Sequence, residues 1–105
     1  MNKKIIIIED ERPMAKILKM KLQHEGVEVD IASNGEEGLE KLKSNTYNLA
    51  VLDLIMPVMD GFAVLEEMKK NNMIVPTIVA SNLSQSGDED RSKELGAVDY
   101  FIKSN

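Results

Sequence analysis

Short apolar runs alternate with helix-patterned stretches along the whole chain, and this alternation constrains the fold more than any other feature. Five runs rich in β-branched residues have the length of strands, namely 4–9, 27–32, 48–53, 75–81 and 98–102. Three stretches between them, 12–25, 35–43 and 61–71, have apolar residues at helical spacing, and a fourth, 88–95, is a weaker, mostly charged helical stretch. Strands that alternate with helices predict a parallel sheet with right-handed crossovers. We therefore expect a doubly wound α/β fold whose functional site lies at the carboxyl ends of the strands.

Local signals support these helix boundaries. Asn34 and Asp60 stand where N-cap residues are expected for the second and third helical stretches. Pro13 suits the first turn of the first helix, and Gly26 and Gly96 suit the stop positions of the first and fourth. The first and third strands are so apolar that we expect both to be buried on both faces of the sheet.

Composition excludes several functional classes. A length of 105 residues suits a single domain, 1–105, and leaves no room for two. The absence of cysteine excludes disulfide, thiol and iron–sulfur chemistry and fits a reducing compartment, so we expect a cytoplasmic protein. A formal charge of −5 argues against direct binding to nucleic acid. Purely apolar runs reach only four residues, as in 5–8, which is too short to span a membrane.

Charged and polar side chains follow four of the five predicted strands. Glu9 and Asp10 end the first strand, Asp53 the third, Ser81 the fourth and Lys103 the fifth. Two carboxylates about 4 Å apart repel by about 4 kcal/mol at an effective dielectric constant of about 20, so such a cluster needs positive charge. Hard oxygen ligands with no soft ligand favour Mg²⁺ or Mn²⁺ and leave a metal position for an anionic phosphoryl group.

Each of these residues also has a purely structural interpretation. The acidic triplet 9–11 is typical of a solvated helix start, where the helix dipole favours negative charge. Asp53 could be a strand-end cap, although isolated carboxylates avoid apolar segments. Lys103 alone is a common surface lysine and Ser81 a common loop hydroxyl. Their placement together at the ends of four strands is the specific signal.

Four segments in this order resemble the receiver domain of bacterial two-component response regulators. They are IIIIEDE at 5–11, VLDLIMPVMDG at 51–61, PTIVAS at 76–81 and LGAVDYFIK at 95–103. The second segment is the most specific, and the resemblance covers nearly the whole chain. It implies a three-layer, flavodoxin-like sheet of five parallel strands in the order 2-1-3-4-5.

The resemblance also implies roles for the residues at the strand ends. Asp53 matches the phosphoacceptor, whose carboxylate attacks phosphorus. Asp10 and Glu9 match the metal ligands, completed by Asp53 itself and by the backbone carbonyl of Ile55. The implied cofactor is Mg²⁺, with Mn²⁺ as a possible substitute. Lys103 would pair with a phosphoryl oxygen as a point charge.

The same resemblance implies a conformational switch and the partners that would operate it. Ser81 matches the hydroxyl that moves toward the phosphoryl group, and Tyr100 matches the aromatic residue that turns inward with it. The implied function is a phosphorylation-activated signalling switch in a phosphorelay, which phosphorylates itself and is not a turnover enzyme. The phosphoryl donor would be a histidine kinase, a phosphotransfer protein or a small phosphodonor, with no nucleic acid or membrane as direct partner.

The sequence departs from the family pattern in three places. Ser104 stands where the family usually has a proline after the lysine. Ile55 and Leu83 are apolar at two positions that influence access of hydrolytic water, so we expect slow autodephosphorylation. The family has a further amphipathic helix after the fifth strand, and the sequence ends at Asn105. We expect the fold to lack this helix, and part of one sheet face to lie bare and pair with a second copy of the chain by symmetric docking or strand exchange.

Two other functions compete with the signalling switch. One is a Mg²⁺-dependent phosphohydrolase of the haloacid-dehalogenase type, which also uses an aspartate nucleophile. That class places its nucleophile after the first strand and needs a longer chain, whereas here the matching residue, Asp53, follows the third strand. The other is a receiver-like docking or dimerisation module with weak or no phosphorylation. Incubation with acetyl phosphate and Mg²⁺ separates this module from the switch.

Overall fold

The computed structural model describes residues 3–82 and 87–103, and in these residues strands and helices alternate as the sequence predicts. Every boundary lies within two residues of the expected one. The elements in chain order are β1 (Lys4–Ile8), α1 (Arg12–His24), β2 (Glu28–Ala32), α2 (Gly35–Ser44), β3 (Leu49–Leu52), α3 (Gly61–Lys70), β4 (Thr77–Ser81), α4 (Asp88–Glu94) and β5 (Asp99–Ile102).

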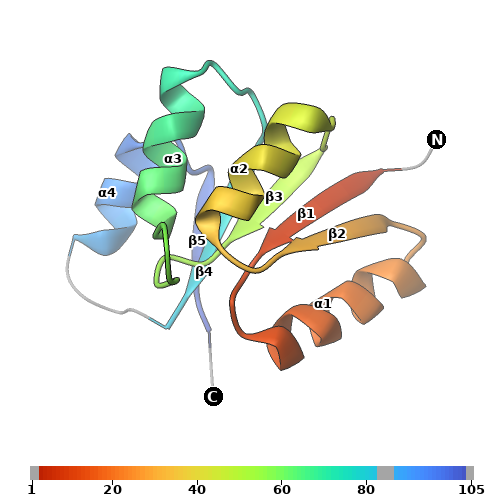
Figure 1. Cartoon of the computed structure of the whole chain (residues 1–105). Helices are drawn as coiled ribbons and strands as arrows, with labels where there is room; N and C mark the ends of the chain where they lie inside the picture. The colour runs from red at the N-terminus through yellow and green to blue at the C-terminus, as the bar shows by residue number, and fades with distance from the viewer. Residues whose placement is uncertain (1–2, 83–86, 104–105) are drawn as a thin grey trace.

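The strands form one parallel sheet in the order β2-β1-β3-β4-β5, which confirms the order implied by the resemblance (Figure 1). The order reverses direction at β1, which pairs with β2 on one side and β3 on the other. The loops that leave the carboxyl ends of β1 and β3 therefore diverge from one another and leave a crevice. None of the helices in the described ranges is long and apolar enough to cross a membrane.

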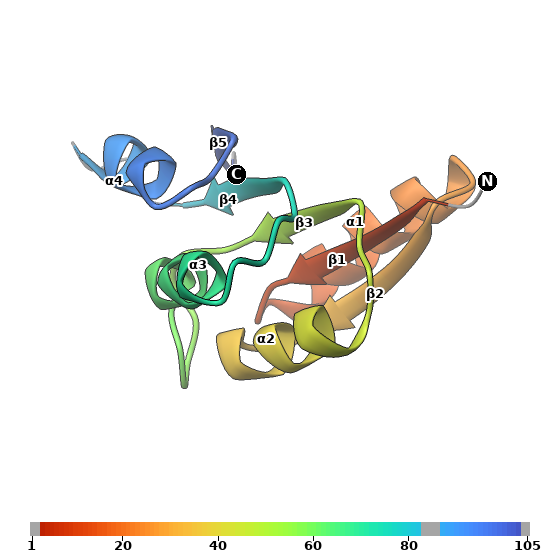
Figure 2. The same cartoon turned by 90° about the horizontal axis from the view of Figure 1, so that it is seen from above.

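The main core lies between the sheet and the pair α2 and α3 (Figure 2). Ile6, Ile8 and Leu52 face this side, where they pack with Val64 of α3 and Val79 of β4. All five side chains are almost completely buried, and each contributes roughly 1.5–3 kcal/mol by leaving water. This packing holds β1 and β3 rigidly side by side, and with them the residues at their carboxyl ends.

The opposite face of the sheet is covered only in part. There α1 packs over β1 and β2, with Ala15 buried against Ile7 and Val29. Leu49 and Val51 of β3 are only half-buried on this side, so the expectation that the third strand is buried on both faces is wrong for that strand. The physical reason is that no helix among the described residues covers β3, β4 and β5 on this face. Phe101 of β5 is accordingly 54% exposed.

The predicted helix ends are confirmed by hydrogen bonds and backbone angles. The Glu37 backbone N–H donates to the Asn34 side chain (2.9 Å), and Ala63 donates to Asp60 (2.9 Å). Gly26 follows α1 in the left-handed region, with φ of 86°. Glycine suits this position because it has no Cβ to clash in that conformation.

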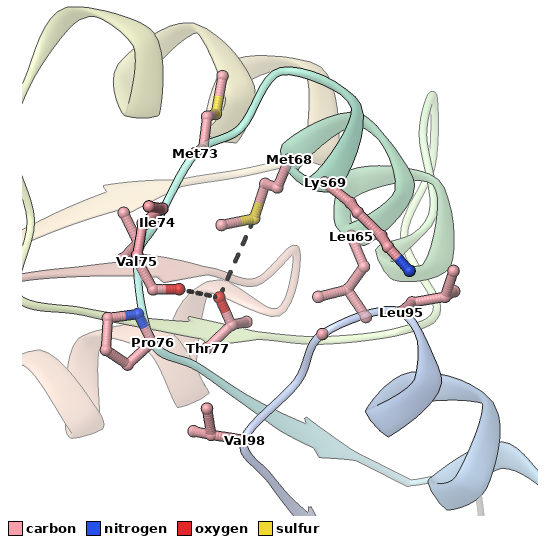
Figure 3. Close-up of a pocket in the computed structure, with 11 residues that line it drawn as sticks. Leu65, Met68, Lys69, Met73, Ile74, Val75, Pro76, Thr77, Leu95 and Val98 are labelled. Atoms are coloured by element: carbon pink, nitrogen blue, oxygen red, sulfur yellow. Dashed lines mark hydrogen bonds between the residues drawn. The ribbon is translucent and has the colours of Figure 1, made fainter.

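An apolar pocket lies between α3 and the start of β4, at the amino end of the strands (Figure 3). The Thr77 hydroxyl donates to the Val75 carbonyl (3.0 Å) and faces the Met68 sulfur at 4.0 Å. Lys69 is the one charged residue that lines this pocket. The pocket thus lies at the opposite end of the strands from the carboxyl edge, and no carboxylate lines it that could hold a metal ion.

Candidate functional site

Backbone pairing brings the strand ends together at one edge of the sheet. The Asp53 N–H donates to the Ile8 carbonyl (3.0 Å), so Asp53 lies beside the end of β1. The Lys103 N–H donates to the Ser81 carbonyl (2.7 Å), so Lys103 lies beside the end of β4. The site therefore forms at the crevice where the strand order reverses, as expected for a sheet of this type.

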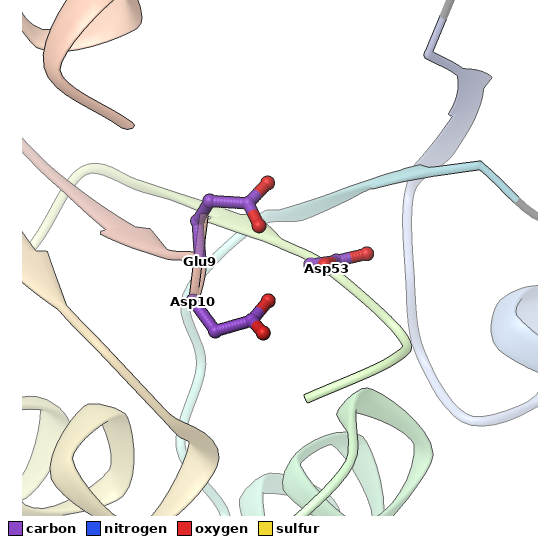
Figure 4. A group of neighbouring side chains, drawn as sticks. All are labelled: Glu9, Asp10 and Asp53. Carbon is purple, nitrogen blue, oxygen red and sulfur yellow. The ribbon is translucent and has the colours of Figure 1, made fainter. Parts of the chain in front are cut away.

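Three carboxylates converge in this crevice (Figure 4). One oxygen from each of Glu9, Asp10 and Asp53 lies within 4.8 Å of the others. Glu9 and Asp53 are each only 6% exposed, whereas Asp10 is the most exposed of the three. Local hydrogen bonds hold two of them, since Glu9 accepts from the Glu11 N–H (3.1 Å) and Asp53 from the Leu54 N–H (2.8 Å).

Lys103 provides the positive charge within this cluster. Its ammonium group contacts a carboxylate oxygen of Glu9 directly and lies 3.4 Å from Asp53 Oδ2. Burial raises the pKa of Glu9 above its usual value, against the opposing effect of its hydrogen bond with Lys103. Burial lowers the pKa of Lys103, but the bond to Glu9 and the charge of Asp53 outweigh it, and the net pKa is raised. Lys103 is therefore held in its charged form.

The donor chemistry of the cluster fits a hard divalent cation. Three carboxylates and one ammonium group leave a formal charge of −2, and all candidate ligand atoms are oxygens. Mg²⁺ prefers such ligands and keeps several exchangeable positions, which an anionic substrate can occupy. Glu9, Asp10 and Asp53 are thus the residues that would hold the ion.

A small pocket beside the cluster contains two further residues that were predicted from the sequence. Ser81 is fully buried and lines this pocket with Asp53 and Asp10. Ile55 lies at the rim of the pocket and is 59% exposed. The ligand role of the Ile55 carbonyl stays a prediction. Asn82 also lines the pocket and was not singled out from the sequence, although its place directly after the strand end was a usable signal.

Tyr100 lies apart from this pocket. It pairs with Val79 across β4 and β5, and its half-buried ring packs against the edge of the main core. Its role as an aromatic switch stays a prediction. Leu83 and Ser104, the other two positions at which the sequence departs from the family pattern, lie outside the described residues.

The loop that follows β3 contains a strained residue. Val58 is 75% exposed and has φ of 69°, a conformation that β-branched residues rarely adopt. Val58→Gly removes a strain of about 1–2 kcal/mol, of which the greater flexibility of unfolded glycine offsets part. We expect the glycine variant to gain about 0.5–1 kcal/mol in free energy of unfolding, measured by urea titration. Val58→Ala is the control and stays close to wild type, and equal stability of all three proteins would contradict the prediction.

The fold and this site together define a class of protein. A parallel sheet of order 2-1-3-4-5 with an acidic triad and a lysine at its carboxyl edge is a doubly wound domain with its candidate site at the crevice where the strand order reverses. The sequence profile of the response regulator receiver domain matches residues 5–105. The chain therefore belongs to the response regulator receiver domain family. Members of this family are signalling switches of two-component systems and not turnover enzymes.

Curated relatives are transcriptional and response regulators. The chain is 38% identical to response regulator ArlR of Staphylococcus saprophyticus over 95% of its own length and 45% of that protein. It is 34% identical to the alkaline phosphatase synthesis regulatory protein PhoP of Bacillus subtilis, over 98% of the chain and 43% of the relative. The chain thus spans less than half the length of these relatives.

Solved structures of related proteins have the same fold as this chain. A receiver domain of a Francisella response regulator superposes with a TM-score of 0.92 at 29% identity, covering 97% of this chain and 84% of the other. TrrA of Thermotoga maritima, solved in complex with Mg²⁺ and BeF, superposes with a TM-score of 0.86 at 37% identity, covering 97% and 87%. The fold class expected from the sequence is confirmed.

Proposed function

We propose that the chain is a phosphorylation-activated switch in which Asp53 accepts a phosphoryl group with the help of Mg²⁺. The observation that supports this most strongly is the position of Asp53, whose carboxylate lies beside the Glu9 and Asp10 oxygens and 3.4 Å from the Lys103 ammonium group. The Mg²⁺–BeF complex of the Thermotoga relative supports Mg²⁺ as the cofactor. Mn²⁺ would substitute for it, because it prefers the same oxygen ligands.

The chemical step is an in-line displacement at phosphorus. An Asp53 carboxylate oxygen forms a new P–O bond, and the bond from phosphorus to the imidazole nitrogen of a phosphohistidine, or to the acetate oxygen of acetyl phosphate, breaks. The leaving group takes the electron pair of the broken bond. Bound Mg²⁺ would supply positive charge to the phosphoryl oxygens. Lys103 pairs with one of these oxygens, and Ser81 donates a hydrogen bond to another.

The new charge then changes the surface of the domain. A phosphoryl group adds about −1.5 to −2 charges, which draw the Ser81 hydroxyl toward the site. Tyr100 lies on the neighbouring strand, so movement at the end of β4 gives its ring room to turn inward. A partner that prefers this second surface shifts the population only by its difference in affinity.

The test is the intact mass of the protein after incubation with acetyl phosphate and Mg²⁺. We expect one phosphoryl adduct on the wild-type chain and none on Asp53→Asn, because the amide is not a competent nucleophile. Removal of Mg²⁺ with EDTA should abolish the adduct, and Mn²⁺ should restore it. No adduct on the wild-type chain would contradict the proposal and favour the docking module that lacks phosphorylation.

We expect the phosphoryl group, once formed, to be lost slowly. Ile55 is an exposed apolar side chain on the rim of the small pocket beside Asp53, where it gives hydrolytic water no hydrogen-bonding partner. Ile55→Asn supplies such a partner and should shorten the half-life of the adduct several-fold, as followed by intact mass. Ile55→Val is the matched apolar control. Equal half-lives for the wild type and the asparagine variant would contradict the prediction.

The proposed phosphoryl donor is a histidine kinase or a phosphotransfer protein of the cytoplasm. The Borrelia burgdorferi relative solved as a CheX–CheY–BeF₃–Mg²⁺ complex shows that a protein of this fold binds another protein in such a state. Purified kinase domains can be screened for transfer of labelled phosphate to the wild-type chain, with Asp53→Asn as the control.

The open part of the α1 face supports a proposed homodimer. Ile17 and Met20 of α1 and Phe101 of β5 are 56%, 69% and 54% exposed on or beside it. Symmetric docking would also bring together two α1 helices that are rich in Lys and Arg and have no acidic residue. Association should therefore strengthen with salt, measured by sedimentation velocity, and weaken in Phe101→Glu. A monomer mass that does not change with protein concentration at either salt level would contradict dimerisation.

A further inference from the structure

The loop between α3 and β4 is apolar although it lies at the surface. It contains four consecutive apolar residues, MIVP at 73–76, and none of them is fully buried. Met73 and Val75 pack against the main core, whereas Ile74 between them is 94% exposed, more than any other large apolar side chain of the described ranges. Apolar runs that reach the surface are unusual unless they serve a function, because they leave apolar area in water. The composition of this loop therefore points to a contact with another molecule.

This loop forms part of the wall of the apolar pocket at the amino end of the strands (Figure 3). The buried side chains of Leu65 and Met68 also line the pocket, as does Val98, which is 61% exposed and leads into β5. The pocket has a volume of about 350 Å³, which is more than twice the roughly 150 Å³ of an apolar cavity that holds benzene. It also falls within the range of about 300–1,000 Å³ that is typical of small-molecule sites. The pocket is thus large enough for a small apolar ligand.

The polar side chains that line the pocket are those of Thr77 and Lys69. The Thr77 hydroxyl is buried and donates to the Val75 carbonyl (3.0 Å), so its hydrogen already has a partner within the chain. Lys69 differs, because no carboxylate in the described part of the chain forms an ion pair with it. Its bond to the Glu94 carbonyl is 3.5 Å long, beyond the usual range of about 2.7–3.2 Å. The Lys69 ammonium group can therefore turn toward an anion at the pocket without losing an ion pair.

We propose that this pocket binds an aliphatic monocarboxylate of medium chain length, with the chain against the apolar walls and the carboxylate at Lys69. The chemistry of the lining residues supports this ligand class, since Lys69 is the one charged residue among them and no acidic side chain is there to repel an anion. An exposed ion pair contributes little free energy, so the aliphatic chain supplies most of the affinity and the charge supplies selectivity. The pocket lies at the opposite end of the strands from Asp53, and the proposal does not depend on phosphorylation.

Amide chemical shifts of the full ¹⁵N-labelled chain test the proposal by titration with sodium octanoate. We expect saturable shifts confined to the amides of 73–77 and 95–98, which surround the pocket. Butyrate has four methylene groups fewer and should bind at least tenfold more weakly, because each buried methylene contributes about fourfold to affinity. Three results would overturn the proposal, namely no saturable shifts, equal affinities for the two acids, and octanoate shifts confined to the exposed side of α1.

Lys69→Met tests the contact with the carboxylate. Methionine keeps an apolar stem and removes the charge, so octanoate should bind roughly threefold more weakly, whereas octanol, which has the same chain and no charge, should bind as before. Lys70→Met is the matched control, because it removes the neighbouring lysine of the last turn of α3, which does not line the pocket. Both probes should bind this control like the wild type. Equal octanoate affinities for the wild type and Lys69→Met, or equal losses in the two variants, would overturn the proposed role of Lys69 and with it the ligand class.

Asp53→Asn separates this site from the phosphoryl site. The variant should give the same octanoate shifts at 73–77 and 95–98 as the wild type, because Asp53 does not line the pocket. Loss of these shifts in Asp53→Asn would overturn the independent site. Failure of the phosphoryl adduct in the mass experiment would overturn the proposed function alone, and the octanoate titration would still decide whether the pocket binds a carboxylate.

Discussion

Gly61→Ala is expected to destabilise the domain by roughly 2–3 kcal/mol and to slow phosphorylation of Asp53 about 100-fold. A Cβ atom on Gly61 would lie 2.3 Å from the Asp53 carbonyl oxygen and 2.8 Å from Leu54 Cα. Both are backbone atoms, so no side chain can rotate to make room. The Gly61 N–H also donates to the Leu54 carbonyl (2.9 Å), and this bond ties the start of α3 to the end of β3. Alanine must therefore push the backbone of the phosphoacceptor out of place.

Gly38→Ala is the matched control for this prediction. The three atoms nearest to a Cβ there are side-chain atoms of Ile8, at 2.7 to 3.0 Å, and alanine also improves the helix propensity of α2. The Ile8 side chain can adjust, so the cost should be smaller and the phosphorylation rate close to wild type. Urea unfolding and the rate of adduct formation measure the two effects. Equal behaviour of the two variants would show that the close approach at Gly61 does not position Asp53.

Lys103→Met is expected to have the second large effect. The substitution leaves Glu9 and Asp53 buried at 6% exposure without the ammonium group that neutralises them. Removing one partner of a buried pair costs about 3–5 kcal/mol when the other charge stays unpaired, and protonation of Glu9 reduces this cost. Phosphoryl transfer should fall about 100- to 1,000-fold, because a charge aimed at the transferring group is lost. Adduct formation by mass and unfolding by urea measure the two effects.

The loss of stability in Lys103→Met should depend on pH. Burial already raises the pKa of Glu9 from 4.5, and removal of Lys103 takes away the strongest opposing effect. A raised carboxyl pKa means that the folded state binds the proton more tightly, so stability falls as pH rises through that pKa. The variant should thus come closest to wild type below about pH 4.5 and be weakest at neutral pH, where added Mg²⁺ should restore part of the loss. Lys93→Met is the control, because it removes an exposed ion pair on α4. Its stability should show no such dependence on pH.

Much of the fold could be predicted from local patterns. The β-branched runs and the helical spacing depend on neighbouring residues, so they indicated all nine elements and the cap residues Asn34 and Asp60. The strand-end residues of the site were also predictable, because the carboxyl ends of parallel strands share one edge. Strand order was implied only by the resemblance, since periodicity does not say which strands pair.

The partial exposure of β3 was not predictable from its composition. The run 48–53 is as apolar as a strand covered on both faces, yet Val51 is only half-buried because burial depends on what covers the strand. In the same way, the sequence shows Arg91 only as one charged residue of a polar helix. The fold alone reveals that its guanidinium group lies 4.0 Å from the centroid of the Phe62 ring. The Lys103 contact with Glu9 joins residues 94 positions apart.

Local sequence patterns specify the alternation of elements, their ends and the edge at which the functional groups gather, because these follow from hydrophobic period and local capping. The three-dimensional packing sets which carboxylate touches Lys103, how closely Gly61 approaches Asp53 and where Arg91 meets the Phe62 ring. These depend on distances between segments far apart in the chain, which are set by the packing of the sheet against its helices.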